Sequence, residues 1–177
     1  MLPALLSALS LGGCATVTVK TDSDPSAHLG KYHTYVLAPP PHGQSLSPTS
    51  EAALRAALRV SLSTRRIEEI PSGKPDLAVV RHIFRQGGLS PQEYASWGYG
   101  ASWPFRDGHY AAWTGAPSAY MTASAYADGT LVLDFVDTKT RRLVFRGVGK
   151  GVVGSRESTA RNIEDAVAKI VAAMPGR

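Results

Sequence analysis

Strands are predicted wherever apolar and polar residues alternate, or where β-branched and aromatic residues cluster. Valine alternates with threonine and lysine over residues 16–20, and residues 32–37 are rich in β-forming side chains. Residues 65–70 and 77–84 carry the same signal on either side of a turn that contains two prolines and a glycine. These four segments are therefore expected to enter a sheet.

The C-terminal half of the chain predicts an antiparallel meander. Residues 120–126 alternate in polarity, and Asp128-Gly129 then offers the residue types that tight hairpin turns favour. The next strand covers residues 131–135, and a second polar turn leads to a third strand over residues 143–153.

Helical spacing follows Ser47-Pro48, which suits an N-cap and a first helical residue. Leu54, Leu58 and Leu62 recur at every fourth position, which predicts an apolar stripe that packs against the core.

A second helix is expected at the C-terminal end, capped by Ser158 or Thr159. Its apolar stripe consists of Ile163, Ala166, Val167, Ile170, Val171 and Met174. Two helices and five or six strands, joined mostly by short turns, predict an α+β fold. Both helices would pack on one face of an antiparallel sheet.

Residues 86–118 sustain no strand or helix period and contain all three tryptophans of the chain. We interpret them as a long loop, a feature that is often functional. The aromatic residues that would form a contact surface are Trp97, Tyr99, Trp103, Tyr110 and Trp113. In the alternative interpretations the rings fold back over the sheet, or the segment is a disordered tether.

The N-terminal segment predicts lipid attachment. An uncharged apolar stretch ends in Leu-Gly-Gly-Cys, the pattern of a bacterial lipobox, at the sole cysteine, Cys14. Residues 1–13 are too short to span a bilayer, which takes about 20 apolar residues. They are expected to be a signal peptide, and residues 14–177 a single periplasmic domain. Because the segment lacks the usual Lys or Arg, we also expect the true start codon to lie upstream of Met1.

Lipidation of Cys14 would leave no thiol for a disulfide, a metal site or a nucleophile. The formal charge is +5, but the Lys and Arg residues are scattered, so a nucleic-acid partner is not expected. Ala15 follows the cysteine, where an Asp would resemble an inner-membrane retention signal. The expected location is the periplasmic face of the outer membrane, with the acyl chains as the membrane contact.

One glycine-rich run, Gly149 to Gly154, fits the literal dinucleotide-binding pattern G-x-G-x-x-G. A nucleotide fold needs a further strand carrying an acid about 20 residues later, and this chain ends after the helix. Gly147, Gly149 and Gly151 instead share one face of a strand, where a helix or an aromatic ring can approach closely.

Catalytic and metal-binding constellations are weak in this chain. The five histidines show no zinc-binding spacing and are interpreted as solvated or edge-strand residues: His28, His33, His42, His82 and His109. Asp134 and Asp137 raise the idea of paired carboxylates, but cross-strand pairing of Asp134 with Arg142, Arg146 or Lys150 explains it more simply. No cofactor, no metal and no enzymatic activity are expected.

From Cys14 onward the chain resembles the bacterial lipoproteins grouped as domain of unknown function 4136. The matching pieces are Gly13-Cys14-Ala15, Lys31-Tyr32-His33-Thr34-Tyr35, Pro75-Asp76-Leu77-Ala78-Val79-Val80, Asp128-Gly129-Thr130-Leu131-Val132-Leu133-Asp134-Phe135-Val136-Asp137 and Leu143-Val144-Phe145-Arg146-Gly147. The Gly/aromatic loop also matches. The resemblance implies an anchored envelope protein with an α+β domain and supplies no activity.

The sequence thus predicts a lipid-anchored envelope lipoprotein that acts as a binding or structural module without catalysis. Two alternatives remain open. One is an envelope hydrolase or lipid-handling enzyme that uses the aromatic loop as a pocket wall. The other is a module that binds glycan or peptidoglycan through that loop. Another envelope protein is a further possible partner.

Overall fold

A computed structural model describes residues 17–40, 45–84, 103–105, 108–110, 129–153 and 156–176. The elements in chain order are β1 (Thr18–Ser23), the 3-10 turn η1 (Leu29–Lys31), β2 (Thr34–Leu37), α1 (Pro48–Ser63), β3 (Glu68–Glu69), β4 (Leu77–Phe84), β5 (Trp103–Phe105), β6 (Gly108–Tyr110), β7 (Thr130–Asp137), β8 (Arg142–Lys150) and α3 (Arg156–Ala172).

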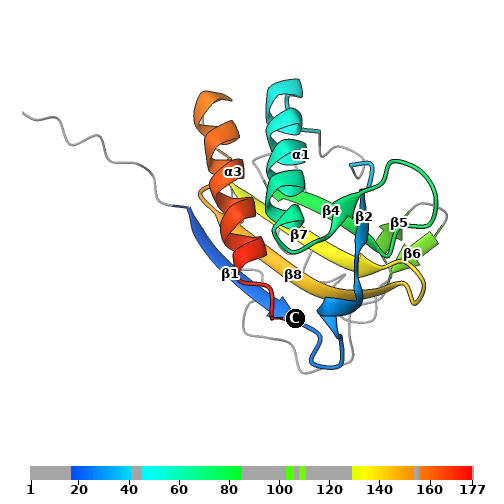
Figure 1. Ribbon diagram of the computed structural model, residues 1–177. Helices are drawn as coiled ribbons and strands as arrows, with labels where there is room; N and C mark the ends of the chain where they lie inside the picture. Colours follow the sequence, from blue (N-terminus) through cyan, green and yellow to red (C-terminus); the bar gives the residue numbers. More distant parts are fainter. Residues whose placement is uncertain are drawn as a thin grey trace, which may run out of the picture.

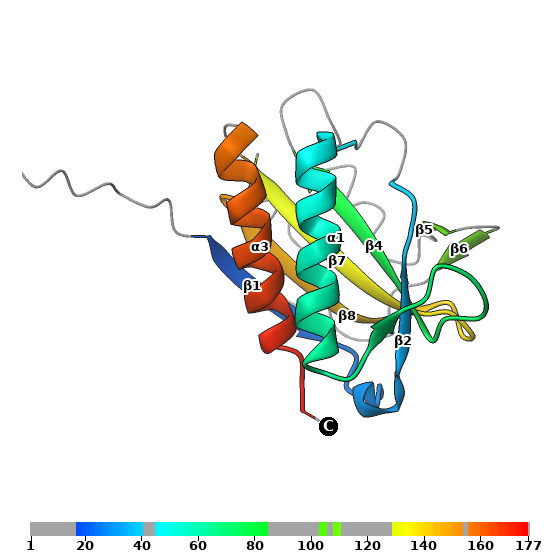
Figure 2. The ribbon, with the colours of Figure 1, turned by 45° about the horizontal axis from the view of Figure 1, so that its top comes forward.

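The described elements form two layers (Figure 1). A six-stranded sheet has the order β1-β8-β7-β4-β2-β3, and β5 and β6 form a separate two-stranded sheet. Helices α1 and α3 lie side by side on one face of the large sheet (Figure 2). The predicted α+β class and the placement of both helices on one face are confirmed.

The large sheet is mixed, whereas an antiparallel sheet was expected. Strands β1, β8, β7 and β4 pair antiparallel, but β2 runs parallel to both β4 and β3. The reason is the connection: α1 returns the chain to the end of the sheet where β2 began, so the next strand repeats the direction of β2. The two C-terminal strands of the expected meander do form a hairpin, β7–β8.

Helix α1 matches its sequence signal. Ser47 is the N-cap, and its side chain accepts a hydrogen bond from the Ser50 amide over 3.2 Å. Leu54, Leu58 and Leu62 are fully buried, as the spacing predicts. The stripe of α3 is buried as well, but this helix begins at Arg156, before both predicted caps.

Several strand ends differ from the prediction because of local backbone conformation. The strand expected over 65–70 is reduced to β3, since Arg66 adopts a left-handed conformation with φ 55°. Likewise β8 stops at Lys150, because Gly151 follows with φ 75°. At the N-terminal end β1 is shifted toward Ser23, and residues 29–31 form a 3-10 turn before β2.

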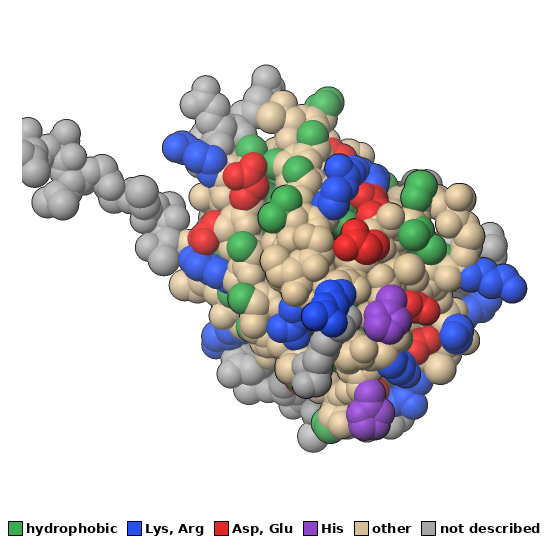
Figure 3. All heavy atoms as spheres, in the orientation of Figure 1, with side chains coloured by type: hydrophobic (Ala, Val, Ile, Leu, Met, Phe, Trp, Pro, Cys, Tyr) green, Lys and Arg blue, Asp and Glu red, His purple; other side chains and the backbone are tan. Residues whose placement is uncertain are grey.

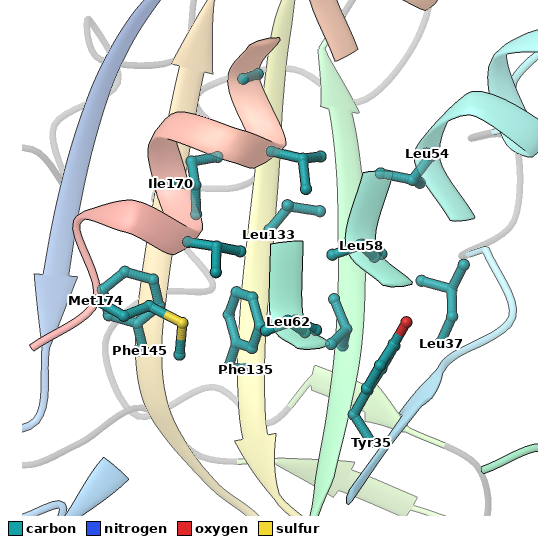
Figure 4. Packing of buried hydrophobic residues seen from close by; sticks show 14 of the residues in the cluster. Tyr35, Leu37, Leu54, Leu58, Leu62, Leu133, Phe135, Phe145, Ile170 and Met174 are labelled. Carbon is teal, nitrogen blue, oxygen red and sulfur yellow. The ribbon is translucent and has the colours of Figure 1, made fainter. Parts of the chain in front are cut away.

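The main core lies between the sheet and the helices (Figure 4). Leucine, isoleucine and valine of α1 and α3 meet the inner side chains of the strands, including Leu133, Phe135 and Phe145. Phe135 and Phe145 contact each other edge to face, with ring centroids 5.5 Å apart. We call this side of the sheet the helix face.

Close helix packing explains the glycine run of β8. A Cβ atom built on Gly147 would lie 2.2 Å from Ile170 Cγ2 of α3, and one on Gly149 would lie 3.1 Å from Ala166 Cβ. The predicted close approach is confirmed at these two glycines. Gly151 serves a different purpose, because its positive φ ends the strand.

The opposite side of the sheet, which we call the second face, is also buried. Its apolar residues form a separate cluster: Ala38, Ala78, Val80, Phe84, Val132, Val136, Leu143 and Val148. Residues 86–118 were predicted to be a loop without strands, but they contain the antiparallel pair β5–β6. The predicted strand over 120–126 lies outside the described residues, and in the described sheet the neighbours of β7 are β4 and β8.

Candidate functional site

Three charged or titratable side chains lie in a row across the second face. Asp134 on β7 stands directly opposite Arg146 on β8, and His82 comes from β4 on the other side of β7. Arg146 Nη2 donates to Asp134 Oδ2 over 2.6 Å, and Arg146 Nε donates to Oδ1, so the pair is bidentate. His82 Nε2 lies 3.4 Å from Asp134 Oδ2. Each of these side chains is at most 2% exposed.

Burial and pairing together set the charge of this cluster. Burial by itself raises the pKa of Asp134, but the Arg146 guanidinium and the hydrogen bond with His82 lower it to well below its ordinary range. Burial lowers the pKa of His82 and outweighs the opposing effect of Asp134. Asp134 is therefore a carboxylate near neutral pH, and His82 is a neutral imidazole.

The cluster is arranged to cross-link three strands. A carboxylate held by a bidentate guanidinium in an apolar setting is a poor general base, because its pKa lies far from neutrality. The expected cross-strand pairing of Asp134 is confirmed, with Arg146 as its partner. The expectation that His82 is solvated or on an edge strand is wrong, since it lies on the central strand β4 and is 2% exposed.

Asp137, the second carboxylate considered for acid–base chemistry, holds a turn together. Its Oδ1 atom accepts hydrogen bonds from the backbone amides of Lys139 and Thr140, at 2.9 and 3.0 Å. The buried Tyr32 hydroxyl donates to its Oδ2 atom over 2.8 Å. These contacts tie the hairpin β7–β8 to the segment that precedes β2.

Sequence reasoning missed the role of Asp76. Its Oδ2 atom accepts hydrogen bonds from the amides of His33 and Thr34, at 2.9 and 3.1 Å, and from the Thr34 hydroxyl. Partial burial opposes ionisation of Asp76, but these hydrogen bonds lower its pKa overall. Two of the quoted motifs, Lys31 to Tyr35 and Pro75 to Val80, therefore meet in space.

A polar groove of about 300 Å³ lies where α1 meets the edge strand β3. Its lining consists of Arg55, Arg59, Glu68, Glu69 and Pro71. Arg55 Nη1 donates a hydrogen bond to Glu69 Oε1, and Arg59 Nη2 donates one to Glu69 Oε2 over 3.3 Å. Basic and acidic side chains intermix on the molecular face that carries the helices (Figure 3). This volume is near the lower limit for small-molecule sites, which hold roughly 300–1,000 Å³.

Tyr35 lies beside this groove and is fully buried. It is the register partner of Glu69, and its hydroxyl is directed toward the helix layer (Figure 4). That hydroxyl finds no hydrogen-bond partner among the described residues. Burial raises the pKa of Tyr35, and the nearby Glu69 carboxylate raises it further, so the hydroxyl stays protonated.

The predicted contact surface is only partly described. Trp103 and Tyr110 are register partners in the pair β5–β6, whereas Trp97, Tyr99 and Trp113 lie outside the described residues. Cys14 lies outside them as well. Within the described part of the chain, no helix is long and apolar enough to cross a bilayer. The same part contains no group of three or more metal-ligating His, Cys, Asp or Glu residues.

Comparison with known proteins identifies a family. The family model described as domain of unknown function (DUF4136) matches residues 19–176. A search of curated proteins finds no match.

Solved structures show the same fold. A DUF4136 family protein from Bacteroides thetaiotaomicron VPI-5482 aligns with TM-score 0.63 at 15% identity, over 88% of this chain and 94% of that one. A PDZ domain protein from Parabacteroides distasonis ATCC 8503 aligns with TM-score 0.51 at 13% identity, over 92% of this chain and 37% of that one. A weaker structural similarity, with TM-score 0.48 at 9% identity over 92% of this chain and 99% of that one, is to the PelC dodecamer from Paraburkholderia phytofirmans.

Proposed function

The chain belongs to the DUF4136 family, whose function is unknown, and from this premise we propose that it is a non-catalytic, lipid-anchored module of a bacterial cell envelope. The proposed anchor is an acylated Cys14, and the proposed location is the periplasmic face of the outer membrane. The observation that carries the proposal is the position of the lipobox relative to the folded domain.

The proposed lipobox ends three residues before the first described core residue. Val17, only three residues after Cys14, is 3% exposed and belongs to the main core, and β1 starts at the next residue. Cleavage before Cys14 would therefore remove no residue of the described core. A chain processed there would carry its acyl groups directly at the edge of a folded domain, and two or more anchoring signals hold a protein stably on a membrane.

A non-catalytic role is supported by the contacts of three carboxylates that are buried or half-buried. Asp134 is bound by Arg146, Asp137 holds a turn, and Asp76 binds the backbone before β2. Each of these carboxylates has a structural task that accounts for its position. The hydrolase and glycan-binding alternatives gain no supporting contact from the described residues.

Substitution of the anchor cysteine tests the proposal. We expect Cys14→Ala to move the protein from the detergent-requiring membrane fraction to the soluble periplasmic fraction, because the acyl chains are its proposed membrane anchor. The matched control is Ser10→Ala, which leaves the Leu-Gly-Gly-Cys run intact and should remain in the membrane fraction. Intact mass of the mature parent chain should include acyl groups. A Cys14→Ala protein that still requires detergent would contradict the anchor.

A further inference from the structure

The point at which the chain enters the folded domain is well defined. The Val17 side chain is buried, and Lys169 Nζ of α3 donates a hydrogen bond to the Val17 carbonyl over 3.0 Å. From Thr18 onward the chain is paired with β8. The entry point is thus held between the first strand and the last helix.

Very little chain separates this point from the proposed anchor. Only Ala15 and Thr16 lie between Cys14 and Val17. Three Cα–Cα steps of about 3.8 Å reach at most about 11 Å. If Cys14 is acylated, the start of β1 is confined to the layer next to the phospholipid headgroups.

The groove lies at the opposite edge of the same sheet. Strand β1 is one end of the order β1-β8-β7-β4-β2-β3, and β3 is the other. Five steps of about 4.8 Å between neighbouring strands separate the two edges by about 24 Å. The helix layer repeats this order, because α3 packs beside β1 (Figures 1 and 2) and α1 contacts β3.

We propose that the edge formed by β1 and α3 lies against the headgroups of the bilayer, whereas the edge formed by β3 and α1 faces away from it. This orientation rests on the proposed acylation of Cys14. The short tether sets the orientation, and Lys169, an exposed cation at the entry point, is paired with Asp165 over 2.7 Å. The polar groove of Arg55, Arg59, Glu68, Glu69 and Pro71 is then presented to the periplasm, clear of the lipid surface.

Matched fluorescent probes on the two helices test the orientation. Ala173 follows Lys169 by four residues, and Ala52 precedes Arg55 by three, and both alanines are exposed. Ala173 therefore lies near Lys169, which contacts Val17 just before β1, and Ala52 lies near Arg55, which contacts Glu69 of β3. Ala173→Cys and Ala52→Cys are each labelled in the mature acylated protein, where Cys14 is blocked. Labelled protein is reconstituted into phosphatidylcholine vesicles that contain a nitroxide-headgroup lipid.

We expect the Ala173 probe to be quenched several-fold more strongly than the Ala52 probe. Equal quenching, or stronger quenching at Ala52, in protein whose acylation is verified by mass would overturn the orientation and leave the anchor standing. Absence of acyl mass, or undiminished vesicle binding by the Cys14→Ala forms, would instead refute the anchor itself. Unchanged thermal unfolding of both labelled proteins establishes that the probes report on the native fold.

Discussion

Asp134 illustrates how a single side chain acquires its role from neighbours that are distant in sequence. Its cross-strand partner Arg146 was among the candidates that alternation within a hairpin suggests, because residues on facing strands pair directly. The contribution of His82 was not predictable, since it depends on β4 being the other neighbour of β7. A local sequence pattern predicts which strands pair across one hairpin turn. The strand on the other side of β7 is determined by the topology of the whole sheet.

The neutral state of His82 predicts a pH dependence of stability. Burial lowers its pKa in the folded state below the ordinary value of about 6.5, so the unfolded chain binds more protons as the pH falls. The stability that the folded state gains from a neutral His82 is present in full above about pH 6.5. It is lost as the pH drops toward the pKa of His82 in the folded state. The free energy of unfolding should thus decline as the pH falls below about 6.5, with a slope of up to about 1.4 kcal/mol per pH unit.

Denaturant titrations at a series of pH values measure that slope. His82→Gln should flatten it, whatever its effect on absolute stability. His33→Gln, which alters an exposed imidazole, is the matched control and should retain the slope of the parent. A slope that survives in His82→Gln would assign the pH dependence to another group.

At the level of elements, the contact between β8 and α3 depends on glycines of β8, whose lack of a side chain lets the helix approach closely. The glycine-rich run was correctly interpreted as a site of close approach, which the structure shows at Gly147 and Gly149. The element that packs against these glycines could not be predicted, because a glycine in a strand indicates only that some other group lies close to the backbone. The structure identifies Ile170 above Gly147 and Ala166 above Gly149.

Gly147→Ala should destabilise the protein by about 1–3 kcal/mol, because the added methyl group overlaps Ile170. Thermal or denaturant unfolding measures the loss. In an Ile170→Ala background the same substitution should have little effect or a favourable one, since the space is then open. Gly176→Ala, where an added Cβ meets nothing within 4 Å, is the control. An equal loss of stability on Gly147→Ala in both backgrounds would show that Ile170 is not the group with which the added methyl group collides.

At the level of the whole molecule, the two ends of the described chain belong to one core. That core contains Val17 before β1 and Met174 after α3, so neither end is an appendage. Asp76 and Asp137 also connect the segment before β2 to turns elsewhere in the sheet. A domain built in this way should lose stability as a unit when its first strand is removed.

Truncation locates the beginning of the stable domain. A chain that starts at Ala15 should melt at the same temperature as the mature protein without acyl groups, because Val17 and β1 are intact. A chain that starts at Pro25 loses the pairing of β1 with β8 and the buried Val17. We expect its melting temperature to fall by about 10 °C, as a loss of about 3 kcal/mol implies for a chain of this size. Calorimetry of the two chains would contradict this boundary if they melted together.

The sequence by itself determined the elements whose signals are local: the capped helix with Leu54, Leu58 and Leu62, the strand over 77–84, the hairpin at Asp137 and the family. Spacing and turn chemistry act over a few residues, so they survive in any tertiary context. Only the tertiary structure decided that β2 runs parallel to β4, that His82 is buried, and that Arg55, Arg59 and Glu69 meet in a groove. Those features depend on which elements become neighbours, and that choice is set by the packing of the whole core rather than by any one segment.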